Sequence, residues 1–129
     1  MKTNLLSDGL AIEFQDVYLG APDDVMLDQI RDLWMRNKVA VFRDQSLPDV
    51  ALVGFTRRLG PTHIHVRDQN HDARYPEIMF VSNVKEDGRD LSALGNGELR
   101  WHTDQSYTPK PVNGTMLYGV EIPKDGGAT

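Results

Sequence analysis

The feature that most constrains the fold is a change in how apolar residues are spaced along the chain. Between residues 22 and 60, two stretches repeat apolar side chains at intervals of three and four, which predicts amphipathic helices. After residue 78, apolar residues occur in short runs separated by segments rich in Gly, Pro, Asp and Asn, which predicts strands joined by loops. Helices early and strands late indicate an α+β chain or a mainly β chain decorated with helices.

The first third of the chain is predicted to contain a strand, a helix and a second strand. Residues 10–19 alternate in part and predict a strand or a strand pair. The first helix should begin after Pro22, where two aspartates complement the helix dipole, and end near Asn37. Its apolar stripe consists of Met26, Leu27, Ile30, Leu33 and Trp34. The apolar run 39–42 predicts a buried strand.

A second helix is predicted over residues 48–59. Ser46 is placed as its N-cap, with Asp49 three residues later, and Gly60 is placed to end it. The polar stretch 61–76 holds three of the four histidines and is predicted to be a loop.

The second half is predicted to contribute an antiparallel sheet. Its strands are expected at 78–82 and 115–122, with a long loop over 83–97 and a turn over 123–127. Loops rather than helices separate these strands, and this favours antiparallel pairing.

Composition excludes several classes of function. The net charge is -5 and no run of Lys or Arg occurs, which argues against nucleic-acid binding. The absence of cysteine excludes disulfides, thiolate metal ligands and a cysteine nucleophile. No run approaches the roughly 20 apolar residues of a membrane span, and no signal peptide is evident. We therefore expect a cytoplasmic protein.

The segment 101–107, WHTDQSY, carries the clearest candidate chemistry. In an extended chain, residues two apart point to the same side, so His102 and Asp104 would present a nitrogen and an oxygen to one point. These are two thirds of a 2-His-1-carboxylate triad, which binds Fe(II) and leaves open positions. The alternative is an ordinary His and Asp on a polar loop, since this spacing is frequent by chance. The residues alone leave both interpretations open.

A resemblance to a known family favours the metal site. The segment 97–104, GELRWHTD, followed by Thr115–Tyr118 and by the ending PKDGGAT, resembles the Fe(II)- and 2-oxoglutarate-dependent dioxygenases typified by the taurine and chlorophenoxyacetate dioxygenases. Upstream, the segments VAVFRDQ at 39–45 and FTRRLGPTHIH at 55–65 are also similar to that family. The resemblance covers nearly the whole chain.

The resemblance implies a double-stranded β-helix core (a jelly roll, or cupin-like fold) with flanking helices. Residues 1–129 would be the N-terminal part of that single domain, so the core would be incomplete. The family's third iron ligand, a histidine, and its 2-oxoglutarate-binding arginine are expected beyond residue 129. Unpaired strand edges would favour self-association into a homo-oligomer.

The resemblance also implies the chemistry. His102 and Asp104 would bind Fe(II) as the catalytic metal, and the hydroxyl of Thr129 would hydrogen-bond 2-oxoglutarate. With O2, the enzyme would decarboxylate 2-oxoglutarate to succinate and CO2 and oxidise, usually hydroxylate, a small organic substrate. The carboxylate at Asp104 disfavours the related halogenases, which lack it.

Three further residues are candidates for substrate binding. His65 stands where some members of the family place a pocket histidine, although a solvated loop histidine is an equal alternative. Asn83 is expected to face the same pocket or to serve only as a turn residue. Glu98 replaces an asparagine of the taurine-type members; a glutamate would repel a sulfonate or carboxylate and could attract an amine.

Two other classes of function are considered. The chain would serve as a catalytically inactive jelly-roll module if the loops 62–75 and 83–97 only hold a ligand or partner. It would be another cupin-like metal protein, such as an isomerase, if the same two ligands served different chemistry. The family-like ending Gly126–Thr129 argues against the latter.

Overall fold

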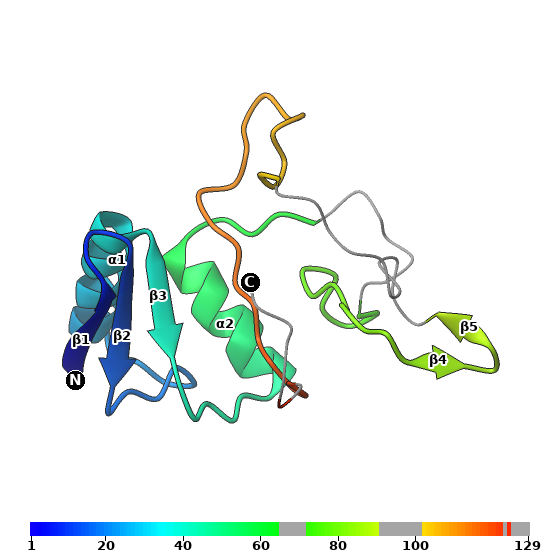
Figure 1. Ribbon diagram of the computed structural model, residues 1–129, viewed down its shortest axis with the longest axis horizontal. Coiled ribbons are helices and arrows are strands. Elements are labelled where there is room, and N and C mark those ends of the chain that lie inside the picture. Colours follow the sequence, from blue (N-terminus) through cyan, green and yellow to red (C-terminus); the bar gives the residue numbers. More distant parts are fainter. Residues whose placement is uncertain (65–71, 91–101, 123, 125–129) are drawn as a thin grey trace. The chain divides into compact units, whose positions relative to one another are not determined.

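The structure is a computed structural model that describes residues 1–64, 72–90, 102–122 and 124 (Figure 1). The chain divides into two compact units, Met1–Gly97 and Glu98–Thr129, and each is described by itself. All helices and strands found in the described residues belong to the first unit. The prediction of a single domain over 1–129 stays a prediction.

A mixed three-stranded sheet forms the start of the first unit. It consists of β1 (Lys2–Ser7), β2 (Ala11–Gln15) and β3 (Val39–Phe42), with β2 in the middle. β1 and β2 are antiparallel, and the turn between them contains Gly9 at a φ of 65°, which glycine adopts without strain. β2 and β3 run parallel and in register, so that residues 11–14 pair with residues 39–42 (Figure 1).

The sheet confirms some predictions and corrects others. The strand predicted at 39–42 is confirmed, but it is not buried as expected, because β3 lies at the edge of this sheet, with Val39 exposed and residues 40–42 half-buried. β2 lies within the predicted 10–19 strand. β1 was not predicted; all of its side chains are exposed, so it carries no apolar alternation that would mark it. The predicted order of a strand, a helix and a second strand is confirmed by β2, α1 and β3, and β1 adds one strand before them.

Helix α1 (Asp24–Asn37) begins and ends close to its predicted limits. The Asp23 side chain caps the first turn by accepting a hydrogen bond from the Met26 backbone N–H at 2.7 Å. At the other end Lys38 has a φ of 63°, and its N–H donates to the Trp34 carbonyl. Leu27 and Ile30 are buried, and α1 contacts both β2 and β3, so its apolar stripe packs on the sheet.

Helix α2 (Asp49–Leu59) confirms the second predicted helix but not its cap. The N-cap is Pro48, which makes no side-chain hydrogen bond, and Ser46 lies outside the helix. The reason is steric, because a residue that precedes proline, here Leu47, is disfavoured in helical conformation. Gly60 ends the helix as predicted, and its N–H donates to the Thr56 carbonyl at 3.3 Å.

The core of the first unit is formed by apolar side chains from the sheet, both helices and their connections. They are Ile12, Phe14, Leu19, Leu27, Ile30, Leu47, Val53 and Phe55. Phe42 links β3 to both neighbours, stacking on Phe14 at 4.8 Å between ring centroids and meeting Phe55 edge-on at 6.3 Å. Each fully buried side chain of this kind contributes about 1.5–3 kcal/mol.

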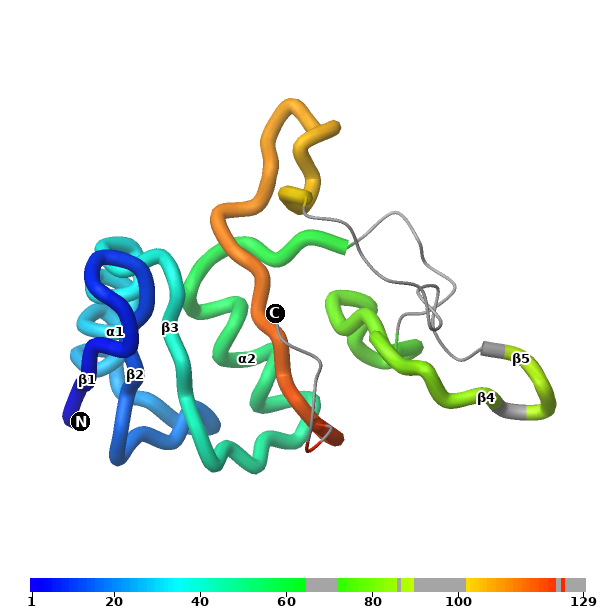
Figure 2. Tube along the Cα trace, viewed as in Figure 1, coloured from blue at the N-terminus to red at the C-terminus, as the bar shows by residue number. Residues whose placement is uncertain are grey.

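A two-residue hairpin follows later in the first unit. β4 (Lys85–Glu86) and β5 (Arg89–Asp90) pair antiparallel around Asp87 and Gly88, which have φ values of 50° and 77° (Figure 2). Two consecutive positive φ angles in an Asp-Gly pair are typical of a tight hairpin turn. The predicted 83–97 loop therefore contains a hairpin, and residues 91–97 lie outside the described residues.

The strand predicted at 78–82 is wrong. Only Met79 has a bridge pairing. The backbone of Ile78 is already used in a local loop, where its N–H donates to Tyr75 at 2.9 Å and its carbonyl accepts from Asp72 at 3.1 Å. These bonds replace the ladder that an apolar run of this length needs to become a strand. The loop prediction for 61–76 is confirmed for residues 61–64 and 72–76, the part that the structure describes.

The second unit has no helix or strand among residues 102–122 (Figure 1). The strand predicted at 115–122 is therefore wrong, since an apolar run becomes a strand only beside a hydrogen-bonding neighbour. The described residues of the chain are α+β, as predicted, but they do not by themselves form a jelly roll. Neither helix found among the described residues is long and apolar enough to cross a membrane.

Candidate functional site

His102 and Asp104 lie side by side in the second unit, as the sequence predicts. The imidazole Nε2 of His102 is 3.2 Å from the carboxylate Oδ1 of Asp104. The two side chains are 54% and 55% exposed, so both remain accessible from solvent. The segment at 102–103 has no regular structure, and Asp104 opens a turn that runs to Tyr107.

The turn after Asp104 is held by its own backbone. The Gln105 carbonyl accepts two hydrogen bonds from Thr108, one from the N–H at 3.0 Å and one from the hydroxyl at 2.9 Å. Gln105 itself has a φ of 55°, in the left-handed region that residues with side chains rarely adopt. The reversal of the chain immediately after the second candidate ligand is therefore fixed locally.

Thr115 also contacts this pair, and sequence reasoning missed it. Its hydroxyl donates to Oδ2 of Asp104 at 3.2 Å across eleven residues of sequence. The sequence interpretation assigned Thr115 to the start of a strand and gave it no role at the site. A signal was present, because Pro109 and Pro111 predict a turn that returns the following segment towards the motif.

The donor pair fits a divalent metal in type and separation. An imidazole nitrogen and a carboxylate oxygen are two of the three donors in the facial triad of non-haem iron. Two ligand atoms on adjacent corners of an octahedral ion, each bonded at about 2.1 Å, lie about 3 Å apart, close to the observed 3.2 Å. Within the residues that the structure describes, no group of three His, Cys, Asp or Glu side chains could hold a metal. His102 and Asp104 would therefore supply two of the ligands.

The structure does not test the other predicted site residues. Thr129, His65 and Glu98 lie outside the described residues. Asn83 is exposed and precedes β4 in the other compact unit. The roles proposed for these four residues stay predictions.

The motif VAVFRDQ has a structural role that explains two of its polar residues. Arg43 donates to Glu13, a side chain only 10% exposed on β2, and forms an ion pair with it. This guanidinium and the amide of Gln15 hold the pKa of Glu13 below its ordinary value. Gln45 fastens the segment before α1, because its amide donates to the Val17 carbonyl at 2.8 Å and accepts from the Leu19 N–H at 3.0 Å.

A second set of charges ties residues 72–77 to α2. Arg57 donates through both Nε and Nη2 to one oxygen of Glu77, and this holds the pKa of Glu77 below its ordinary value. Arg74 bridges to Asp49 at 3.2 Å. The backbone N–H groups of Arg74 and Tyr75 lower the pKa of Asp72. These carboxylates are engaged in local structure that connects residues 72–77 to α2.

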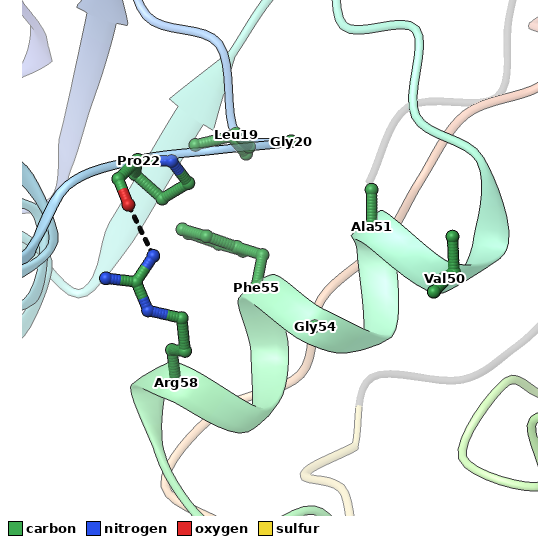
Figure 3. A pocket seen from close by; sticks show the side chains of 8 residues that line it. All are labelled: Leu19, Gly20, Pro22, Val50, Ala51, Gly54, Phe55 and Arg58. Carbon is green, nitrogen blue, oxygen red and sulfur yellow. Dashed lines mark hydrogen bonds between the residues drawn. The ribbon is translucent and has the colours of Figure 1, made fainter.

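A hollow of about 320 Å³ lies beside α2. It is lined by Leu19, Gly20, Pro22, Val50, Ala51, Gly54, Phe55 and Arg58 (Figure 3). Its single charged group, Arg58, already donates to the Pro22 carbonyl and to Asp24 Oδ1 at 2.6 Å. Among the residues that the structure describes, none of the predicted site residues lines this hollow.

Comparison with known proteins connects the site to a family. The family model described as "Taurine catabolism dioxygenase TauD, TfdA family" matches residues 5–129. That match contains His102, Asp104 and every element of the fold except the first residues of β1.

Several curated proteins are similar to the chain. It is 27% identical over 121 residues to an (S)-phenoxypropionate/alpha-ketoglutarate-dioxygenase of Sphingobium herbicidovorans. The aligned region covers 88% of the chain and 38% of that protein. It is 33% identical over 110 residues to the alpha-ketoglutarate-dependent 2,4-dichlorophenoxyacetate dioxygenase of Cupriavidus pinatubonensis. This alignment covers 78% of the chain and 38% of the dioxygenase.

A third relative has a different name. The pentalenolactone F synthase of Streptomyces avermitilis is 30% identical over 112 residues, which cover 85% of the chain and 37% of the synthase. The chain thus spans under two fifths of the length of each of these relatives. Because the family model matches almost the whole sequence, the chain belongs to the TauD/TfdA family of dioxygenases.

Proposed function

We propose that the protein is a non-haem Fe(II)- and 2-oxoglutarate-dependent dioxygenase that oxidises, usually by hydroxylation, a small organic substrate. The observation that carries the proposal is the 3.2 Å approach of His102 Nε2 and Asp104 Oδ1 in a chain of the TauD/TfdA family. Two relatives carry alpha-ketoglutarate in their names, which supports 2-oxoglutarate as the cosubstrate.

In this proposal each predicted site residue has a defined task. His102 and Asp104 hold the iron, and the hydroxyl of Thr129 donates to 2-oxoglutarate. Bound iron and 2-oxoglutarate would supply the activation of O2, with release of succinate and CO2. The chain's own contribution is to hold the ligands in place, to limit access of water and to orient the substrate. A third protein donor would come from outside the described residues.

His65, Asn83 and Glu98 are proposed to line the substrate pocket. Two relatives are named for different substrates, (S)-phenoxypropionate and 2,4-dichlorophenoxyacetate, so the family alone leaves the substrate open. A glutamate at position 98 disfavours an anionic substrate and favours one that carries an amine. Replacement by asparagine, Glu98→Asn, should lower KM for anionic substrates relative to cationic ones.

The fold proposal extends the same reasoning. The family implies a cupin-like fold, and we propose that the small sheet and its helices belong to the N-terminal part of a jelly-roll core. A cytoplasmic location and self-association stay predictions.

The proposal is tested by anaerobic addition of Fe(II) and 2-oxoglutarate to the full-length protein. We expect the weak visible charge-transfer band of the iron chelate, and succinate formation when O2 is admitted. Both signals should disappear in His102→Ala. They should persist in His63→Ala, which removes an exposed histidine that has no assigned role.

The inactive binding module predicts the opposite result. A folded protein that develops no band, with His102→Ala indistinguishable from the parent, would end the dioxygenase proposal. Differential scanning calorimetry of both variants shows whether each of them still folds.

A further inference from the structure

The two oxygens of the Asp104 carboxylate have different partners. Oδ1 lies 3.2 Å from His102 Nε2, whereas Oδ2 accepts the hydroxyl of Thr115 at 3.2 Å. Because a carboxylate is planar, a donor on one oxygen fixes the direction in which the other points. Thr115 therefore sets which oxygen of Asp104 is turned towards the imidazole.

This assignment matters for a metal with open coordination positions. A carboxylate can bind through one oxygen or through both, and the second mode takes an additional position on the ion. The facial triad needs one position per protein ligand, so that the remaining positions stay open. A hydroxyl hydrogen-bonded to Oδ2 favours binding through Oδ1 alone.

The hydrogen bond itself contributes little to folding. Both Thr115 and Asp104 are exposed among the described residues. Solvent competes for both groups, so the net contribution of such an exposed hydrogen bond to stability is small. Removal of the Thr115 hydroxyl should consequently affect the ligand far more than it affects the stability of the chain.

We infer that Thr115 is a positioning residue for the metal ligand Asp104, which its hydroxyl holds in the orientation that presents a single oxygen beside His102 Nε2. The inference rests on the proposed iron site and adds a residue to it. Partners that orient a ligand in this way typically change metal affinity by roughly 10–100-fold when they are removed.

The test compares valine and serine at position 115. Full-length protein is titrated anaerobically with Fe(II), and the dissociation constant is measured for the parent, Thr115→Val and Thr115→Ser. Valine keeps the shape and removes the hydroxyl, so the dissociation constant should rise by roughly 10–100-fold. Serine keeps the hydroxyl and should restore the parent affinity. The unfolding midpoints of the three proteins should agree.

Thr3→Val is the matched control. It removes an exposed threonine hydroxyl from β1 in the other compact unit, so Fe(II) affinity should be unchanged.

The possible failures are distinguishable. Parent-like affinity in Thr115→Val, with binding still lost in His102→Ala, overturns the role of Thr115 and leaves the iron site standing. Equal weakening by valine and serine also overturns it, because the hydroxyl would then be irrelevant. A parent protein that binds no Fe(II) overturns both the inference and the proposed function.

Discussion

The two compact units differ in how their structure is maintained. In Met1–Gly97, paired strands, two helices and eight buried apolar side chains support one another. In Glu98–Thr129, the described residues contain no strand, and Leu117, Val120 and Ile122 are 73%, 83% and 77% exposed. The first unit therefore builds its own core, and the described part of the second does not.

The candidate ligands nevertheless belong to the second unit. The contacts that join His102, Asp104 and Thr115 lie within that unit, and the turn at Gln105 and Thr108 fixes the bend between them. The difference between the units indicates that the approach of these two side chains depends on a short motif and one returning residue. A sheet, in contrast, requires partners that are distant in sequence.

The largest test of this comparison is removal of an apolar side chain from each unit. Phe55→Ala empties a buried position that contacts Phe42, so the free energy of unfolding should fall by about 3–5 kcal/mol. Leu117→Ala removes a side chain that is 73% exposed and should change it by less than about 0.5 kcal/mol. Urea denaturation of the two variants gives both values.

Val50→Ala is the matched control within α2, since Val50 is 59% exposed and should behave like Leu117. A cost at Leu117 comparable to that at Phe55 would break the comparison, because it would mean that the second unit is covered and contributes to a core.

The elements that could be predicted from the sequence are those specified by residues close together in the chain. Helix α1 combined an apolar stripe with a capping aspartate, and β3 was a short apolar run bounded by charges. The approach of His102 and Asp104 followed from a spacing of two residues. In each case the residues that determine the structure are neighbours in sequence.

The wrong predictions share a physical cause. The runs 78–82 and 115–122 have the composition of strands, but composition does not say whether a hydrogen-bonding partner is present. Ile78 satisfies its backbone within a local loop instead. β1 was missed for the converse reason, because it pairs with β2 although all of its side chains are exposed. The hydrogen bond from Thr115 to Asp104 spans eleven residues, so no regular spacing of residues in the sequence predicts it.

A smaller effect is expected at the N-terminus of α1, where the first unit relies on a side-chain cap. Asp23→Ala removes the acceptor for the Met26 N–H and should lower the free energy of unfolding by about 1 kcal/mol. Asp28→Ala, which breaks only an exposed ion pair with Arg31, should lower the free energy of unfolding by roughly 0.3 kcal/mol. Equal costs for the two variants would show that α1 is maintained by packing and that its cap is unimportant.

The smallest effect is expected from the charges that fasten residues 72–77 to α2, because the Arg57 side chain is 58% exposed and solvent weakens its pair with Glu77. The pKa of Glu77 is lowered from 4.5, so its ionised form stabilises the folded chain above that pH. This contribution should be lost as the pH falls from 4.5 through the lowered pKa. Glu77→Gln should therefore reduce the acid dependence of unfolding without abolishing it, since Glu13 and Asp72 also have lowered pKa values.

The measurement is a series of urea unfolding curves between neutral and acidic pH. Glu121→Gln is the control, because it neutralises an exposed glutamate of the second unit and should leave the acid dependence as it is in the parent. An unchanged acid dependence in Glu77→Gln would mean that the Arg57–Glu77 pair does not favour the folded chain. The segment 72–77 would then be bound to α2 by weaker contacts, and the self-supporting part of the first unit would be limited to the sheet and its two helices.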